Sequence, residues 1–166
     1  MIYQQTIFTI DECNTIINLI KTDNRYWDSN DRNYKSLLIL NKVHTNWIFE
    51  KLKKFFEEQT GISIIEVRPE IHFHIYEPND YFGIHDDSMD SRVFSVGVLL
   101  NDNFDGGEFV LYPNNKTITL DKLTGNSYIF PVSIKHEVTK IIKGERYSLI
   151  WFLKNTNIKS KLKSLI

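Results

Sequence analysis

Residues 93–100 read VFSVGVLL, a nearly continuous apolar run with the length and composition of a buried strand. Two comparable segments flank it in the sequence, IHFHIY at 71–76 and YSLIWF at 147–152, and the first alternates apolar and polar side chains. Turn-forming residues lie between such segments, as in Asp105-Gly106-Gly107. We therefore expect about eight short strands after Gly61, arranged as a sandwich or barrel, of which the jelly roll leaves a cavity between its sheets.

Two amphipathic helices are predicted upstream of these strands. The first begins at a capping box, in which Thr9 and Glu12 are placed to satisfy free backbone groups at a helix start. The second covers roughly residues 43–59 and has one apolar face and one face rich in Lys and Glu. Because each helix has a single apolar face, we expect both to brace one outer face of a strand core. Helical support then covers about 1–60, and the strand core about 62–154.

The composition is that of a folded chain with one domain, 1–166. Hydrophobic residues make up 42% and charged residues 25%, and the net charge of -1 implies no general attraction to nucleic acid or membranes. The single cysteine, Cys13, excludes an internal disulfide, and the first residues lack the features of a secretory signal. We therefore expect a soluble cytoplasmic protein without a nucleic-acid or membrane partner. The sequence carries no signal for oligomeric state, and the Lys-rich end, 154–166, is interpreted as a solvated segment.

His85 and Asp87 are the first candidates for chemistry. Alternate residues of an extended backbone face the same side, so His85 and Asp87 share a side while Asp86 turns away. Two histidines and one carboxylate on one face of a metal are the ligands of non-haem iron(II) oxygenases. A third ligand must come from another strand, and His136 is the candidate. A His-x-Asp triplet alone is a weak signal, because many exposed turns contain one.

Arg146 and Ser148 share one face of another predicted strand. A guanidinium fork matches a carboxylate with two charge-assisted hydrogen bonds, each contributing about 1.5 to 3 kcal/mol. A neighbouring hydroxyl can add a further donor. The residues alone leave open that Arg146 pairs with a surface Asp or Glu.

Two further groups of residues carry less specific signals. His72 and His74 lie on the face of Tyr76, where each is either a hydrogen-bonded structural histidine or a substrate contact. Aromatic residues between the two helices could form a lid over a cavity or pack in the core. They are Tyr26, Trp27 and Tyr34.

Taken in chain order, these motifs resemble a prolyl-4-hydroxylase-type member of the iron(II)- and 2-oxoglutarate-dependent oxygenase superfamily. The resemblance runs from Arg68 to Leu153. The matching pieces are Tyr76 before a Pro-Asn turn, His85-x-Asp87, Leu100-Asn101, Gly106-Gly107-Glu108-Phe109, Gly125 with Phe130-Pro131, His136-x-Val138 and Gly144-x-Arg146.

The resemblance implies a fold, a cofactor and roles for these residues. The fold would be a mainly β double-stranded β-helix, or jelly roll, braced by two or more N-terminal helices. His85, Asp87 and His136 would ligate Fe(II), and Arg146 would bind the distal carboxylate of 2-oxoglutarate, helped by Ser148. Dioxygen would be the second co-substrate and ascorbate a reductant, with succinate and CO2 as co-products.

The sequence departs from the family pattern at two positions. Leu99 stands where many members have a tyrosine that contacts 2-oxoglutarate, and we expect Tyr76 or Tyr128 to supply that contact. Phe152 stands where nucleic-acid demethylases of the superfamily carry a second arginine, which argues against a nucleic-acid substrate. His74 and Tyr128 are expected to line the active site.

The function expected from the resemblance is hydroxylation of a prolyl or related side chain in a peptide or protein. A hydroxylase of a free amino acid or small metabolite is one alternative. A catalytically silent jelly-roll binding module is another, and a cupin-type metal enzyme without 2-oxoglutarate is a third. The complete ligand set argues against the silent module, while Arg146 and Ser148 argue against the cupin.

Overall fold

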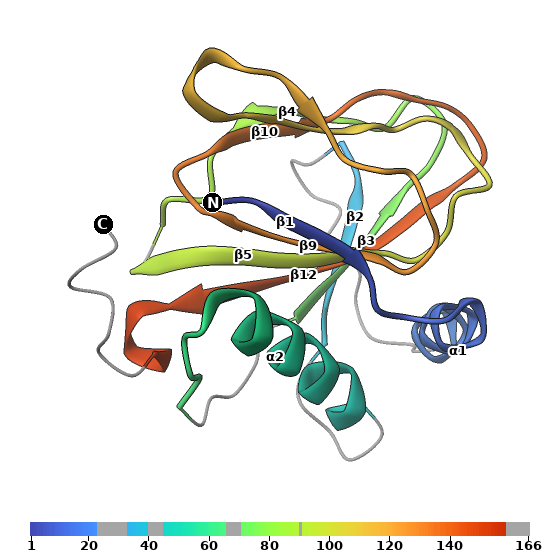
Figure 1. Ribbon diagram of the computed structural model, residues 1–166. Coiled ribbons are helices and arrows are strands. Elements are labelled where there is room, and N and C mark those ends of the chain that lie inside the picture. Colours follow the sequence, from blue (N-terminus) through green and yellow to red (C-terminus); the bar gives the residue numbers. More distant parts are fainter. Residues whose placement is uncertain (23–32, 40–44, 66–70, 90, 159–166) are drawn as a thin grey trace.

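The structure is a computed structural model that describes residues 1–22, 33–39, 45–65, 71–89 and 91–158. Two helices and twelve strands lie within these ranges (Figure 1). In chain order they are β1 (Tyr3–Thr6), α1 (Ile10–Lys21), β2 (Lys35–Ile39), α2 (Asn46–Thr60), β3 (Ile71–Tyr76), β4 (Phe82–His85), β5 (Arg92–Leu99), β6 (Asp105–Gly106), β7 (Phe109–Tyr112), β8 (Ile118–Thr119), β9 (Asn126–Pro131), β10 (Lys135–Val138), β11 (Ile141–Lys143) and β12 (Arg146–Lys154).

The strands form two main antiparallel sheets. The larger sheet has the order β1-β9-β5-β12-β3-β2, the smaller has the order β4-β10-β7-β8, and β6 pairs with β11 alone. Figure 1 shows the smaller sheet lying over one face of the larger sheet, with both helices on the other side. This arrangement confirms the predicted mainly β jelly roll and the predicted placement of the helices.

The strand count differs from the expected eight. Ten strands follow α2 in the described residues, because β6 and β8 are two-residue pairings that carry no periodic signal. Two more, β1 and β2, were not predicted, since strands were expected only after the helices. Both occupy edges of the larger sheet, where backbone pairing with one neighbour is enough to hold a short strand.

The capping box at the start of α1 is confirmed. The Thr9 hydroxyl accepts a hydrogen bond from the Glu12 N–H at 3.2 Å, and the Glu12 carboxylate accepts one from the Thr9 N–H at 2.8 Å. The second helix begins at Asn46 rather than near residue 43. It ends at Gly61, whose φ of 68° is a left-handed conformation that glycine adopts without a steric penalty.

The central strands are buried on both faces, which explains their long apolar runs. On β12, Leu149 and Trp151 belong to the apolar core beneath the helices, and Trp151 packs edge-on against Phe49 of α2 at 5.1 Å between ring centroids. The intervening residues, such as Arg146 and Ser148, face the space between the sheets. Period-two alternation along one strand therefore separates the folding core from a polar interior.

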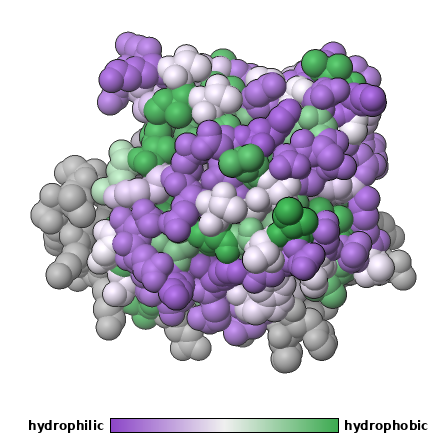
Figure 2. Space-filling view, turned by 45° about the vertical axis from the view of Figure 1, so that its right-hand side comes forward, coloured by the Kyte–Doolittle hydropathy of each residue, from purple (hydrophilic) through white to green (hydrophobic). Residues whose placement is uncertain are grey.

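Nothing in the described part of the chain resembles a membrane-spanning helix, because neither α1 nor α2 combines the required length and apolar composition. Figure 2 shows one face of the molecule, on which hydrophobic residues are scattered among hydrophilic ones.

Candidate metal centre and co-substrate cavity

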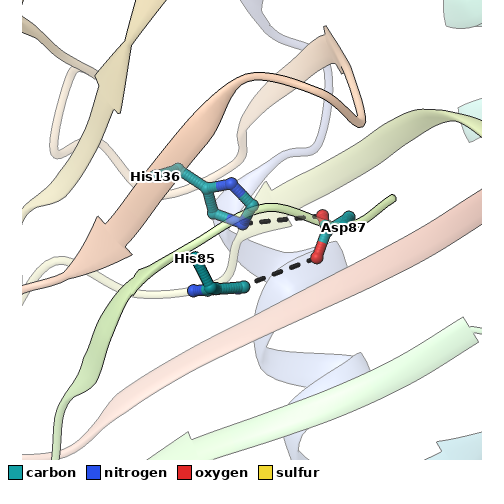
Figure 3. A group of neighbouring side chains, drawn as sticks. All are labelled: His85, Asp87 and His136. Atoms are coloured by element: carbon teal, nitrogen blue, oxygen red, sulfur yellow. Dashed lines mark ion pairs between the residues drawn. The ribbon is translucent and has the colours of Figure 1, made fainter. Parts of the chain in front are cut away.

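His85, Asp87 and His136 converge between the two sheets (Figure 3). His85 ends β4 and lies directly opposite His136 of β10 in the antiparallel register. Asp87 follows β4, where its backbone N–H donates to the carbonyl of Val132 at 2.9 Å. The His85 Nε2 atom lies 3.7 Å from Asp87 Oδ1, and the His136 Nε2 atom lies 3.5 Å from Asp87 Oδ2. Strand pairing thus brings His136 beside His85 and Asp87, which lie far from it in the sequence.

Both imidazoles are oriented by backbone carbonyls. The Nδ1 atom of His85 lies 2.8 Å from the carbonyl oxygen of Gly83, and that of His136 lies 3.0 Å from the carbonyl oxygen of Ile134. A proton on each Nδ1 satisfies these carbonyls and leaves the Nε2 lone pairs facing Asp87. Burial lowers the pKa of His136 and outweighs the opposing charge of Asp87, so the neutral, ligating form is favoured.

The three donors fit a divalent transition metal. Metal–ligand distances of about 2.0 to 2.2 Å place adjacent ligands of an octahedral ion about 3 Å apart. The observed separations of 3.5 and 3.7 Å require only a small closing movement. Two imidazole nitrogens and one carboxylate oxygen, with the opposite side open, form the donor set of non-haem iron(II) sites.

Asp86 and Asp87 are separated as the alternation predicted. Asp86 is exposed and accepts a hydrogen bond from the Ser88 N–H at 3.0 Å, which lowers the pKa of its carboxyl group. Asp87 is only 7% exposed and accepts a hydrogen bond from the Ser95 hydroxyl at 2.5 Å. Ser95 was not among the predicted site residues. Its signal was present in the sequence as the one hydroxyl within the apolar run VFSVGVLL.

Arg146 lies at the start of β12 and is 2% exposed. Its Nη1 donates to the Ser148 hydroxyl at 2.8 Å, and its guanidinium lies 5.3 Å from the ring centroid of Tyr76, the opposite residue on β3. No carboxylate of the described residues pairs with it, and its buried Nε has no hydrogen-bond partner. The interpretation of Arg146 as half of a surface ion pair is therefore wrong. A buried cation without an anion is unfavourable unless a ligand supplies the missing charge.

Tyr128 reaches Arg146 across a gap left by Gly97. A Cβ atom at Gly97 would lie 2.5 Å from the Tyr128 hydroxyl oxygen, so the phenol ring lies directly over the glycine. Burial raises the pKa of Tyr128, while the charge of Arg146 and its hydrogen bond to Tyr128 oppose that rise. Leu99 is buried in an apolar cluster with Tyr76. Both tyrosines expected to replace the family tyrosine thus lie beside Arg146.

A cavity of about 220 Å³ connects these groups. His72 and His74 line it, as predicted from their alternation with Tyr76, and Tyr34 lines it too. The two other residues of the predicted lid, Tyr26 and Trp27, lie outside the described residues. The predicted residues that line the cavity are His74, Tyr76, His85, Asp87, Tyr128, His136, Arg146 and Ser148.

Among the cavity residues that sequence reasoning missed are Phe82 and Arg92. Phe82 stacks on the imidazole of His85 with 3.6 Å between ring centroids. The guanidinium of Arg92 lies 3.8 Å from the ring centroid of Phe152, and its buried Nε has no hydrogen-bond partner. Phe152 is six residues beyond Arg146 on β12, about 20 Å along an extended strand, so Arg92 and Arg146 line different parts of the cavity.

A jelly roll that encloses two histidines, a carboxylate and a buried, unpaired arginine has the features of an iron(II) oxygenase that uses a 2-oxo acid. The family model described as the 2OG-Fe(II) oxygenase superfamily matches residues 71–154, about half of the chain. The chain belongs to this superfamily. Its cofactor is Fe(II), with 2-oxoglutarate and dioxygen as co-substrates.

Solved structures share the whole fold. An oxidoreductase of the 2OG-Fe(II) oxygenase family from Burkholderia pseudomallei is 20% identical, with a TM-score of 0.76 over 95% of this chain and 85% of that one. A prolyl hydroxylase from Trichoplax adhaerens, bound to a peptide fragment of hypoxia inducible factor, is 18% identical, with a TM-score of 0.72 over 93% and 84%. A viral collagen prolyl hydroxylase from Paramecium bursaria Chlorella virus 1, in complex with 2-oxoglutarate, is 19% identical, with a TM-score of 0.71 over 92% and 94%. Comparison with curated proteins gives no match for this chain.

Proposed function

We propose that this protein is a 2-oxoglutarate-dependent dioxygenase that hydroxylates a prolyl or related side chain in a peptide or protein, with succinate and CO2 as co-products. The observation that carries the proposal is the buried Arg146, which lacks an anion and shares a cavity with His85, Asp87 and His136. A metal site alone is generic. A metal site beside an unpaired guanidinium fits a chelating ligand that also carries a distant carboxylate.

In this proposal His85, Asp87 and His136 hold Fe(II) on one side. When bound, Fe(II) would supply the binding and reductive activation of dioxygen, and a metal held by three protein ligands would have room for a 2-oxo acid and dioxygen. Arg146 and the Ser148 hydroxyl bind the distal carboxylate of 2-oxoglutarate. The Tyr128 hydroxyl, held against Arg146, adds a third polar contact. Because these groups are buried, their attraction for the dianion is weakly screened.

The substrate would occupy the part of the cavity beyond the metal. Ile150 and Phe152 of β12 and Phe82 provide apolar and aromatic walls there, which suit a pyrrolidine ring. His74 lies on the same wall and is placed to contact the substrate. The similarity in fold to two prolyl hydroxylases, one of them bound to a peptide, supports a peptidyl substrate.

Arg92 favours a second candidate, a free amino acid or small carboxylic acid. Its guanidinium makes no ion pair with the described residues and stacks on Phe152 in the cavity wall. An unpaired guanidinium can receive a carboxylate with two hydrogen bonds. A free amino acid carries such a carboxylate close to the carbon that would be oxidised.

The test is turnover by the complete protein with Fe(II), ascorbate and 2-oxoglutarate, with and without a library of proline-containing peptides. We expect slow succinate formation without a substrate and faster formation with an accepted peptide that gains one oxygen atom. His85→Ala and Asp87→Ala should abolish both. Oxygen gain by free amino acids in place of peptides would favour the second candidate. No succinate from metal-loaded protein under any of these conditions would refute both.

A further inference from the structure

We propose that Ser95 is a positioning residue that holds the Asp87 carboxylate so that it binds a metal through a single oxygen. The inference rests on the proposed function, because it takes His85, Asp87 and His136 as the metal ligands. By holding the carboxylate in this way, Ser95 determines how many coordination positions of the metal the protein leaves open.

Ser95 links a strand inside the larger sheet to the irregular segment that carries Asp87. It lies on β5, inside the larger sheet, with Phe130 of β9 and Phe152 of β12 as its register partners, and it is 0% exposed. Asp87 lies beyond the end of β4, between the exposed residues Asp86 and Ser88. The rotamer of Asp87 is therefore not fixed by strand pairing. The hydrogen bond from Ser95 Oγ to Asp87 Oδ2 at 2.5 Å ties the carboxylate to the sheet.

The hydrogen bond makes the two carboxylate oxygens different. Oδ2 accepts the Ser95 proton, and no other hydrogen bond to this carboxylate is found among the described residues. Oδ1 keeps its lone pairs and lies 3.7 Å from the Nε2 atom of His85, while Oδ2, which accepts from Ser95, lies 3.5 Å from the Nε2 atom of His136. A donated proton lowers the electron density on Oδ2, so Oδ1 becomes the better metal ligand.

Coordination through one oxygen matters for the co-substrates. Two imidazole nitrogens and one oxygen leave three positions of an octahedron, which suffice for a bidentate 2-oxo acid and dioxygen. A carboxylate bound through both oxygens would leave only two. A hydroxyl is also costly to bury at the centre of a sheet without a partner, and alanine would fill nearly the same space. The presence of serine inside an otherwise apolar run fits a role toward Asp87.

The experiment measures Co(II) binding to the complete protein by calorimetry and by visible absorption, without turnover. Ser95→Ala should weaken Co(II) binding about 10- to 100-fold, the usual effect of losing a hydrogen bond to a metal ligand. It should also change the visible bands, because a second carboxylate oxygen would take a position that water otherwise occupies. Ser127→Ala is the matched control. Ser127 is an equally buried serine on the neighbouring strand β9, and its hydroxyl donates to the Gly125 carbonyl.

A second pair of variants separates positioning from packing. Ser95→Thr and Ser95→Val have the same shape, and only the threonine carries a hydroxyl. We expect Ser95→Thr to bind Co(II) at least tenfold more tightly than Ser95→Val, with thermal midpoints of the metal-free proteins alike. Equal affinities and spectra across wild type, Ser95→Ala and this pair would overturn the inference while leaving the metal site intact. Failure of the wild-type protein to bind Co(II) would instead overturn the proposed function and this inference with it.

Discussion

Gly97→Ala tests how Tyr128 serves the co-substrate pocket. The backbone at residue 97 is extended within β5, so alanine is compatible with the strand. Its Cβ, however, would lie 2.5 Å from the Tyr128 hydroxyl oxygen and closer still to the ring, whereas real Cβ contacts below 3.0 Å are essentially never seen. The end of the phenol must therefore move by roughly 0.5 to 1 Å, which is enough to break a hydrogen bond.

The expected cost follows from the group that Tyr128 contacts. A hydrogen bond to a charged partner contributes about 1.5 to 3 kcal/mol. Since each 1.4 kcal/mol is a factor of ten in affinity, loss of the Tyr128 contact should weaken 2-oxoglutarate binding about 10- to 100-fold. Tyr128→Phe removes the hydroxyl but keeps the ring, and should have a similar effect. The double variant should bind about as weakly as either single variant, because both substitutions remove the same contact.

The assay is calorimetric titration of 2-oxoglutarate into protein loaded with Mn(II), which does not support turnover. The affinity for Mn(II) should change less than twofold, because neither residue is a proposed ligand. Gly83→Ala is a suitable control, since its Cβ would meet nothing closer than 4.0 Å. Equal 2-oxoglutarate affinity in Gly97→Ala and wild type would show that the position of Tyr128 is irrelevant to the pocket.

Two further predictions concern the charged groups of the cavity. Arg146→Ala should weaken 2-oxoglutarate binding more than 100-fold, because about two charge-assisted hydrogen bonds are lost, and should leave the metal affinity unchanged. Arg146→Lys should retain part of the 2-oxoglutarate affinity. Unchanged 2-oxoglutarate affinity in Arg146→Ala, measured by the same titration, would show that Arg146 does not bind the co-substrate. Burial lowers the pKa of His136 below the ordinary value of 6.5, so the folded state binds fewer protons there than the unfolded state. The contribution of His136 to the stability of the metal-free protein is therefore complete above pH 6.5 and is lost as pH falls below it. The thermal midpoint of His136→Gln should depend less on pH in this range than that of wild type, and identical slopes would contradict the assignment.

Much of the fold was visible in the sequence because the central strands are periodic. The segments 71–76 and 147–152 coincide with the interior strands β3 and β12, within two residues at each end. The edge strands β1 and β2 were not visible, since a strand with one partner needs little apolar periodicity. The pairing of strands distant in sequence, such as His136 opposite His85, was not predicted, although ligand chemistry and the family resemblance both named His136 as the third ligand.

The site was predicted where ligand chemistry and chain order agreed. Alternation selected Asp87 over Asp86, and the structure buries Asp87 and exposes Asp86. Residues that act by contacting another residue were missed, because their role depends on a spatial contact that the sequence pattern does not reveal. Ser95 is one case, and Gly97 is another, since a glycine inside a strand reveals its purpose only when Tyr128 is seen to lie over it.

The attachment of Asp87 has a mechanical consequence. His85 and His136 belong to the smaller sheet, whereas the Asp87 carboxylate is tied to the larger sheet through Ser95. An ion bound by all three is therefore a cross-link between the two layers of the sandwich. Metal at about 100 times its dissociation constant should stabilise the native state by roughly 2.7 kcal/mol, and backbone amides of β4 and β10 should exchange more slowly with solvent. The layers would then be held least firmly in protein that has lost its ion.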